Sequence, residues 1–82
     1  MELKDTIEMM NSPDYKERFK AEYYQVKIRA EKLDDMLNRY KLGYLDFTPS
    51  CPIEVLDKQY HLMIEYLMIL SKRAAIEGIV LE

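Results

Sequence analysis

Apolar residues recur at helical spacing in two long stretches of the chain, about residues 13–42 and about residues 53–77. The row in the first stretch alternates steps of four and three residues and consists of Phe19, Tyr23, Val26, Ala30, Leu33, Leu37 and Tyr40. The row in the second stretch consists of Leu56, Tyr60, Met63, Leu67, Leu70 and Ala74. Rows of this kind suit near-antiparallel packing of one helix on another. The pattern therefore predicts an all-α fold with a long antiparallel helical hairpin.

The second long stretch carries more apolar surface than one partner helix can cover. A further row on one flank consists of Val55, Leu62, Tyr66, Ile69 and Ile76, and a smaller row on the other flank consists of Ile64, Met68 and Ala75. Soluble monomers rarely expose apolar patches of this extent. We therefore expect other copies of the chain to cover them, which predicts a homo-oligomer.

A short helix over about residues 2–10 is predicted before the hairpin. A helix of this length needs a longer helix to dock on. On the first long helix, the residues opposite the hairpin row are Ala21, Tyr24 and Ile28. The short helix can cover one apolar patch but not all of them, so it does not remove the reason for self-assembly.

Polar and small residues mark the ends of the long helices. Ser12 predicts a cap at the start of the first one, with Asp14 facing the positive end of its dipole. Gly43 predicts a left-handed end to this helix. Gly78 predicts the end of the second long helix, with Ile79 folded back onto its last turn.

The length of 82 residues allows a single domain over residues 1–82, whose core alone is marginally stable. Cys51 is the only cysteine and the chain has one histidine, so we expect no disulfide, no metal and no cofactor. No apolar run reaches the roughly 18 residues that span a bilayer, and the start of the chain does not resemble a signal peptide. These features predict a cytosolic protein that completes its core by oligomerisation.

The net charge of −3 argues against a protein that coats DNA or RNA, and only residues 14–42 carry a net positive charge. Three lysines project to one side of the first long helix, near two tyrosines: Lys16, Lys20, Lys27, Tyr23 and Tyr24. Ammonium groups bind phosphate, and an aromatic ring offers a stacking face to a base. The flank is therefore interpreted either as a site for a phosphorylated, base-bearing ligand or as a solvated row of charges.

Tyr15 and Arg18 lie near the start of the same helix, where free backbone N–H groups favour anions. Arg29 lies on the side of Arg18, and Glu22 between them can pair with either arginine. This arrangement predicts an ion-pair ladder along the helix. Ligand binding by these residues would need a neighbouring chain.

Asp57 and His61 stand four residues apart on the second long helix, and Cys51 precedes them as a candidate nucleophile. Catalytic pairs of this kind lie in a pocket, which a lone hairpin does not supply. We therefore predict no catalytic residue and no enzymatic activity.

Residues 55–73 resemble the second long helix of small bacteriophage proteins that consist of a short N-terminal helix and a helical hairpin. The residues that carry the match are Leu56, Gln59, Met63, Tyr66, Leu70 and Arg73. Residues 14–25, 31–33 and 45–52 also resemble proteins of crAss-like and related phages. Functional relatives suggested by the resemblance are the anti-CBASS cyclic-nucleotide sponges, whose hairpin is similar to that of an anti-Thoeris sponge.

The resemblance implies a phage protein that binds nucleotide signals of bacterial defence in the host cytoplasm without cleaving them. It also implies a hexamer-like homo-oligomer with ligands between protomers, an aromatic ring on the base and basic side chains on the phosphates. Tyr15 and Lys27 best match the tyrosine and lysine that do this in the family. The candidate ligand-binding residues are Tyr15, Arg18, Lys20, Tyr23, Lys27, Arg29 and Arg73. The expected ligand is a cyclic di- or trinucleotide or an ADP-ribose-type signal.

A second interpretation is a non-enzymatic helical oligomer that serves as a protein–protein adaptor or as a structural phage protein. Exposed apolar rows on helices also bind other proteins, with no small ligand involved. An enzyme that degrades the signal is a more distant third.

Overall fold

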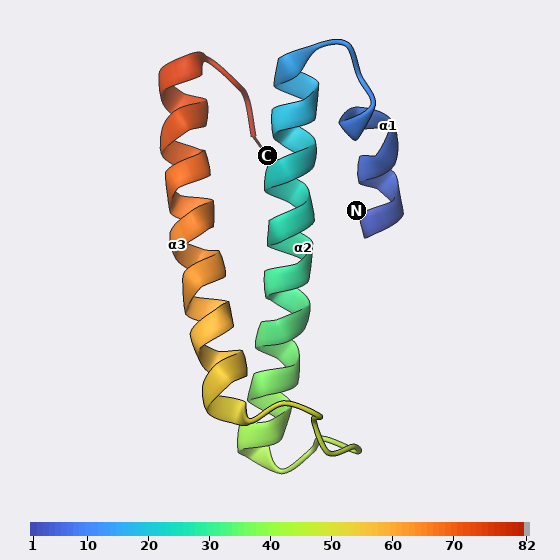
Figure 1. Cartoon of the computed structure of the whole chain (residues 1–82), viewed down its shortest axis with the longest axis vertical. Coiled ribbons are helices and arrows are strands. Elements are labelled where there is room, and N and C mark those ends of the chain that lie inside the picture. Colours follow the sequence, from blue (N-terminus) through green and yellow to red (C-terminus); the bar gives the residue numbers. More distant parts are fainter. Residues whose placement is uncertain (82) are drawn as a thin grey trace.

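The computed structural model describes residues 1–81, and all of its regular structure is helical over that range. The elements are a 3-10 helix η1 (Leu3–Thr6) and the helices α1 (Ile7–Met10), α2 (Tyr15–Leu42) and α3 (Ile53–Glu77). Figure 1 shows α2 and α3 running side by side in opposite directions, with α1 on the other side of α2. The predicted all-α hairpin is confirmed.

The start of α2 differs from the prediction by two residues. Asp14 has an extended backbone and its side chain accepts a hydrogen bond from the backbone N–H of Lys16 at 3.0 Å. Ser12 Oγ accepts from the N–H of Asp14 at 3.1 Å instead, so it stabilises the turn before the helix. The predicted cap at Ser12 was therefore wrong, because Asp14 is the residue that directly flanks the helix. Gly43 ends α2 with a left-handed φ of 78°, as predicted.

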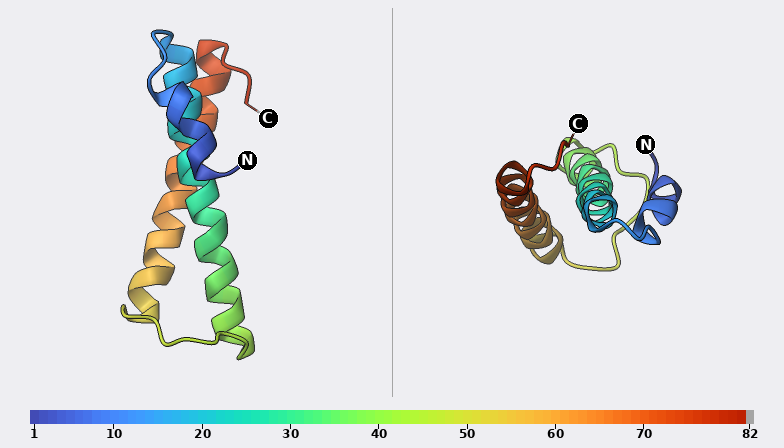
Figure 2. Two further views of the ribbon diagram at one scale, coloured as in Figure 1. Left: turned by 90° about the vertical axis from the view of Figure 1, so that its right-hand side faces the viewer. Right: turned by 90° about the horizontal axis from the view of Figure 1, so that it is seen from above.

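The N-terminal segment docks on α2 and on no other helix. It begins as a 3-10 turn rather than as one helix over residues 2–10, and Thr6 Oγ1 donates to the carbonyl of Leu3 at 2.7 Å. Thr6 is 1% exposed, Ala21 on α2 is fully buried, and Nε2 of Gln25 on α2 lies 3.6 Å from the sulfur of Met10. Figure 2, seen from above, places α2 between α1 and α3. The short segment therefore covers the back of α2, as expected, and leaves α3 untouched.

The best-buried part of the hairpin lies where the chain returns after α3. Phe19, Leu70, Ala74 and Ile79 form a core cluster in which each residue is at most 6% exposed. Gly78 takes a left-handed φ of 71°, and the N–H of Ile79 donates to the carbonyl of Ala74 at 2.9 Å. The predicted return of Ile79 onto the last turn of α3 is confirmed.

One apolar face of α3 remains open in the single chain. It consists of Val55, Leu62, Tyr66, Ile69 and Ile76, which are 42–75% exposed, and is called the outer row below. Tyr66 is the least exposed of them. The N-terminal segment does not reach this row, so the apolar surplus predicted from the sequence is present in the fold. None of the helices within residues 1–81 is long and apolar enough to cross a membrane.

Candidate ligand-binding groove

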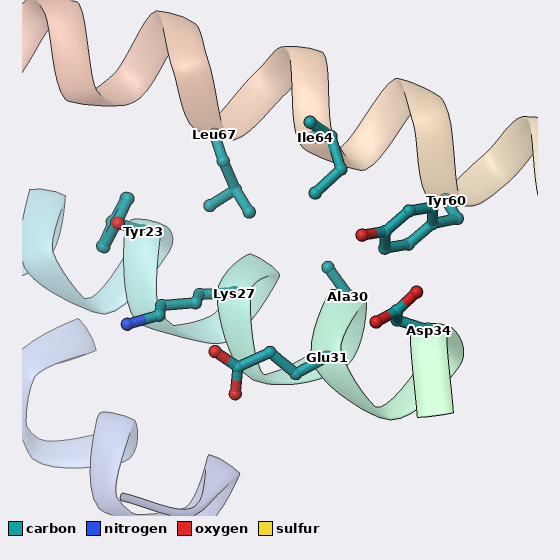
Figure 3. A pocket seen from close by; sticks show the side chains of 8 residues that line it. All are labelled: Tyr23, Lys27, Ala30, Glu31, Asp34, Tyr60, Ile64 and Leu67. Atoms are coloured by element: carbon teal, nitrogen blue, oxygen red, sulfur yellow. The ribbon is translucent and has the colours of Figure 1, made fainter. Parts of the chain in front are cut away.

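A hollow of about 220 Å³ lies on one flank of the hairpin, between α2 and α3. It is lined by Tyr23, Lys27, Ala30, Glu31 and Asp34 from α2 and by Tyr60, Ile64 and Leu67 from α3, and is called the groove below (Figure 3). The α2 residues follow helical spacing and therefore share one face of the helix. Ala30, small and 2% exposed, faces Ile64 and Leu67 and leaves room between the helices. The floor is thus apolar and the rim is polar.

The polar groups on this rim are not used within the chain. Lys27, Glu31, Asp34 and the hydroxyl of Tyr60 form no hydrogen bond or ion pair with any residue of 1–81. Lys27 and Glu31 are four residues apart, a spacing at which opposite charges on a helix often pair. Figure 3 shows the amine of Lys27 on the Tyr23 side instead, with Asp34 beside Tyr60 at the other end. A cation, two carboxylates and a phenol are therefore available to a ligand.

Tyr23 stands at one end of the groove and also lines a second hollow of about 440 Å³. That hollow lies against the C-terminal tail, residues 79–81. The ring of Tyr23 packs edge-on against Tyr24, with 5.4 Å between the ring centroids. Its aromatic surface is thus held in place between two hollows on the same flank.

Of the seven residues predicted to bind a ligand, Tyr23 and Lys27 line the groove. Lys20 lies on the same side of α2, roughly 10 Å further toward the N-terminus. Its amine is 3.4 Å from a carboxylate oxygen of Glu17, and the lysine side chain is 30% exposed. The lysine flank therefore combines a ligand-sized hollow at Lys27 with a single ion pair at Lys20.

The other four predicted residues lie away from the groove within one chain. At 100° per residue, Tyr15, Arg18 and Arg29 point roughly 120–180° away from Lys27 around α2. Tyr15 and Lys27 are also separated by roughly 18 Å along the helix axis. A single chain therefore does not bring together the tyrosine and the lysine that the resemblance suggested.

Arg73 is fixed over the core cluster. Its guanidinium carbon lies 4.9 Å from the centroid of the Phe19 ring, and its Nε donates to Glu77 at 2.8 Å. The hydrogen bond to Glu77 raises the pKa of Arg73 above its ordinary value, and the nearby Glu22 and Tyr15 add to the shift. The guanidinium of Arg73 therefore stays charged. The N–H groups that do not bond Glu77 remain available to a ligand or to a neighbouring chain.

The predicted ion-pair ladder on α2 was wrong. Arg18 Nη1 donates to the carbonyl of Ser12 at 2.7 Å, and Glu22 accepts a hydrogen bond from the hydroxyl of Tyr66 across the hairpin. Arg29 forms no ion pair with the described residues. Arg18 thus bonds the loop before α2, and Glu22 bonds α3. Neither partner is visible from the residue spacing within α2 alone.

The Asp57–His61 pair, which was weighed and rejected as catalytic from the sequence, lies at the surface. His61 is 69% exposed at its side chain, and its Nδ1 lies 2.8 Å from the carbonyl oxygen of Asp57. Cys51 is half-buried in the segment that precedes α3. Nδ1 of His61 also lies 3.5 Å from a carboxylate oxygen of Asp57, so the two side chains contact each other on the exposed side of α3.

Three groove residues were missed from the sequence: Glu31, Asp34 and Tyr60. Glu31 and Asp34 follow Lys27 at helical spacing, so their position on one face was visible. Tyr60 belongs to the hairpin row, which predicts burial against α2. Only the packing of α3 on α2 shows that Glu31, Asp34 and Tyr60 line one hollow together with Lys27.

The fold and the groove define a small helical hairpin protein with a mixed-charge hollow in its seam. A family model described as Sequestin matches residues 13–76, which include all of α2, α3 except its last residue and every residue that lines the groove. The chain belongs to the sequestin family, and the resemblance to a phage nucleotide sponge fits this family. No curated protein and no solved structure matches the chain. The N-terminal segment and the C-terminal tail lie outside the matched residues.

Proposed function

We propose that this protein is a phage-encoded sponge for a nucleotide second messenger of bacterial antiphage defence. It binds a cyclic di- or trinucleotide, or an ADP-ribose-type signal, in the host bacterial cytoplasm and does not cleave it. The observation that carries the proposal is the groove, in which unpaired polar groups surround an apolar floor. Membership in the sequestin family supports binding rather than conversion of a ligand, since the name speaks of sequestration.

The groove supplies each kind of contact that a nucleotide needs. The amine of Lys27 pairs with a phosphate, and the rings of Tyr23 and Tyr60 offer faces for a base. The apolar floor of Ala30, Ile64 and Leu67 lies beneath the base or the sugar. These contacts hold a ligand without attacking it, which is what sequestration requires.

One chain supplies only part of the site. The hollow of about 220 Å³ is smaller than the roughly 300–1,000 Å³ of ordinary small-molecule pockets. The exposed outer row of α3 gives a second copy an apolar surface to pack on. In such a homo-oligomer, a hexamer by the family resemblance, Tyr15, Arg18, Arg29 and Arg73 of a neighbouring chain are the candidates that complete the site. The outer row lies nearly opposite Tyr60, Ile64 and Leu67 around α3, so a copy packed on the outer row leaves the groove open to a further chain.

A second candidate is a helical adaptor or structural phage protein that binds other proteins. It is favoured by the exposed outer row and by the apolar segment between the two long helices, where Tyr44 is 75% and Phe47 is 55% exposed. This candidate makes no use of the unpaired groups in the groove.

The two functions are separated by incubating the purified protein with cyclic di- and trinucleotides and ADP-ribose-type nucleotides. A ligand that binds only the native state raises the melting temperature, and the protein is then denatured so that the released ligand can be analysed. Recovery of intact nucleotide from a protein with a raised melting temperature supports sequestration. Degraded nucleotide indicates an enzyme, and no shift with any nucleotide above micromolar concentration favours the adaptor.

A matched pair of variants connects the binding to the groove. Lys27→Met removes the amine at the rim, and Lys32→Met removes an exposed amine of the same helix that does not line the groove. Nucleotide binding should weaken by roughly tenfold or more in Lys27→Met, since a charge-assisted contact to phosphate is lost. Equal binding by both variants would place the ligand elsewhere on the protein.

A further inference from the structure

Charge is divided along the length of the groove. In Figure 3 the amine of Lys27 lies on the Tyr23 side, the carboxylate of Asp34 lies beside Tyr60, and that of Glu31 lies between them. Lys27 and Asp34 are roughly 10 Å apart along the axis of α2. This separation is comparable to the distance from the phosphate of one nucleotide to the far edge of its base.

Neither carboxylate is neutralised by the described part of the chain. Glu31 and Asp34 form no ion pair there, whereas Asp35, the next residue, lies 3.0 Å from Nε of Arg39. An unpaired carboxylate near an anionic ligand opposes binding through charge repulsion. The carboxylate favours binding only where the ligand presents a hydroxyl or amino group, because such a group donates a strong charge-assisted hydrogen bond to the carboxylate.

We propose that Asp34 and Glu31 set the orientation and the selectivity of the ligand in the groove, an inference that rests on the proposed function. The phosphate lies at Lys27, and a hydroxyl or amino group of the same ligand donates to the carboxylates at the other end. The carboxylates repel phosphate from the Tyr60 end, so the other phosphate of a cyclic dinucleotide or of ADP-ribose lies toward Lys27 or outside the groove. A ligand made of phosphate alone therefore binds weakly, although its charge is higher than that of a nucleotide.

The test compares Asp34→Asn with Asp35→Asn, using calorimetric titration with ADP-ribose, cyclic di-AMP and inorganic pyrophosphate. Asp34→Asn removes the charge and keeps the shape, and Asp35→Asn is the control because Asp35 pairs with Arg39 outside the groove. Asp34→Asn should weaken binding of whichever nucleotide the wild type binds by roughly fivefold or more. It should strengthen pyrophosphate binding, since repulsion is removed. The control should change neither.

Opposite shifts for the two classes of ligand would support the assignment, because a damaged fold weakens both. If the wild type binds a nucleotide and Asp34→Asn binds it equally or more tightly, the orienting role is overturned and sequestration stands. If the wild type binds none of the cyclic di- and trinucleotides and ADP-ribose-type nucleotides named above, the proposed function fails and this inference fails with it. If Asp34→Asn does not fold, Glu31→Gln replaces it in the same titrations. If pyrophosphate binds neither the wild type nor the variant, the change in nucleotide affinity decides the test.

Discussion

Truncation of Leu62 tests whether the outer row of α3 is covered by another copy of the chain. Leu62 is 55% exposed in the single chain, so Leu62→Ala should cost less than about 1 kcal/mol if the protein is a monomer. A leucine buried by an interface behaves like a core leucine, for which truncation costs about 2–5 kcal/mol. We predict a loss of about 2–3 kcal/mol per chain for Leu62→Ala.

Two other leucines calibrate this measurement. Leu70 is 1% exposed within the chain, and Leu70→Ala should cost about 3 kcal/mol in any state of assembly. Leu42 is 69% exposed and lies outside the outer row, so Leu42→Ala should stay within about 0.5 kcal/mol of the wild type. The comparison of Leu62 with Leu42 isolates the effect of the row, because both side chains are exposed in the single chain.

The assay is urea unfolding followed by circular dichroism at two protein concentrations a hundredfold apart. For an oligomer that unfolds as it dissociates, the midpoint rises with protein concentration. We predict such a rise for the wild type and a smaller one for Leu62→Ala. A midpoint that does not depend on concentration, together with equal stabilities of Leu62→Ala and Leu42→Ala, would refute the assignment of the outer row as an interface.

Three smaller changes test the local structure by the same urea assay. Asp14→Ala removes the cap on the N–H of Lys16 and should lower the unfolding free energy by about 1 kcal/mol; no change would mean that another group caps α2. Gly78→Ala should lower the unfolding free energy by about 1–2 kcal/mol, because alanine is strained at a φ of 71°. An added Cβ meets nothing within 4 Å, so no clash contributes to the loss. An unchanged stability would show that this turn relaxes. Tyr66→Phe should cost about 0.5–1 kcal/mol by removing the hydrogen bond to Glu22, and the loss should vanish in a Glu22→Ala background.

The features that could be predicted from the sequence depend on local chemistry. Gly43 and Gly78 end their helices because glycine adopts a left-handed backbone at little cost. The spacing of apolar residues determines which faces of the two long helices pack together. The outer row consists of apolar residues of α3 that are not in this packed face. The spacing of apolar residues is therefore enough to predict the open outer row.

The features that could not be predicted depend on how one helix is rotated and shifted against the other. Tyr66 reaches Glu22 only because α3 presents it to that side of α2, and this contact removes the partner that Arg18 was expected to have. In the same way, Tyr60 faces Asp34 across the space left by Ala30. A periodic pattern assigns residues to faces, but it does not set the register that brings two faces together.

The most direct test of sequestration between chains is native mass spectrometry. The protein is measured together with the nucleotide that raises its melting temperature. We predict an oligomer that carries intact nucleotide, and an oligomer of unchanged size that has lost the nucleotide when Lys27 is replaced by Met. A monomer that binds the nucleotide fully would contradict a shared site. An oligomer that binds no nucleotide would contradict sequestration itself.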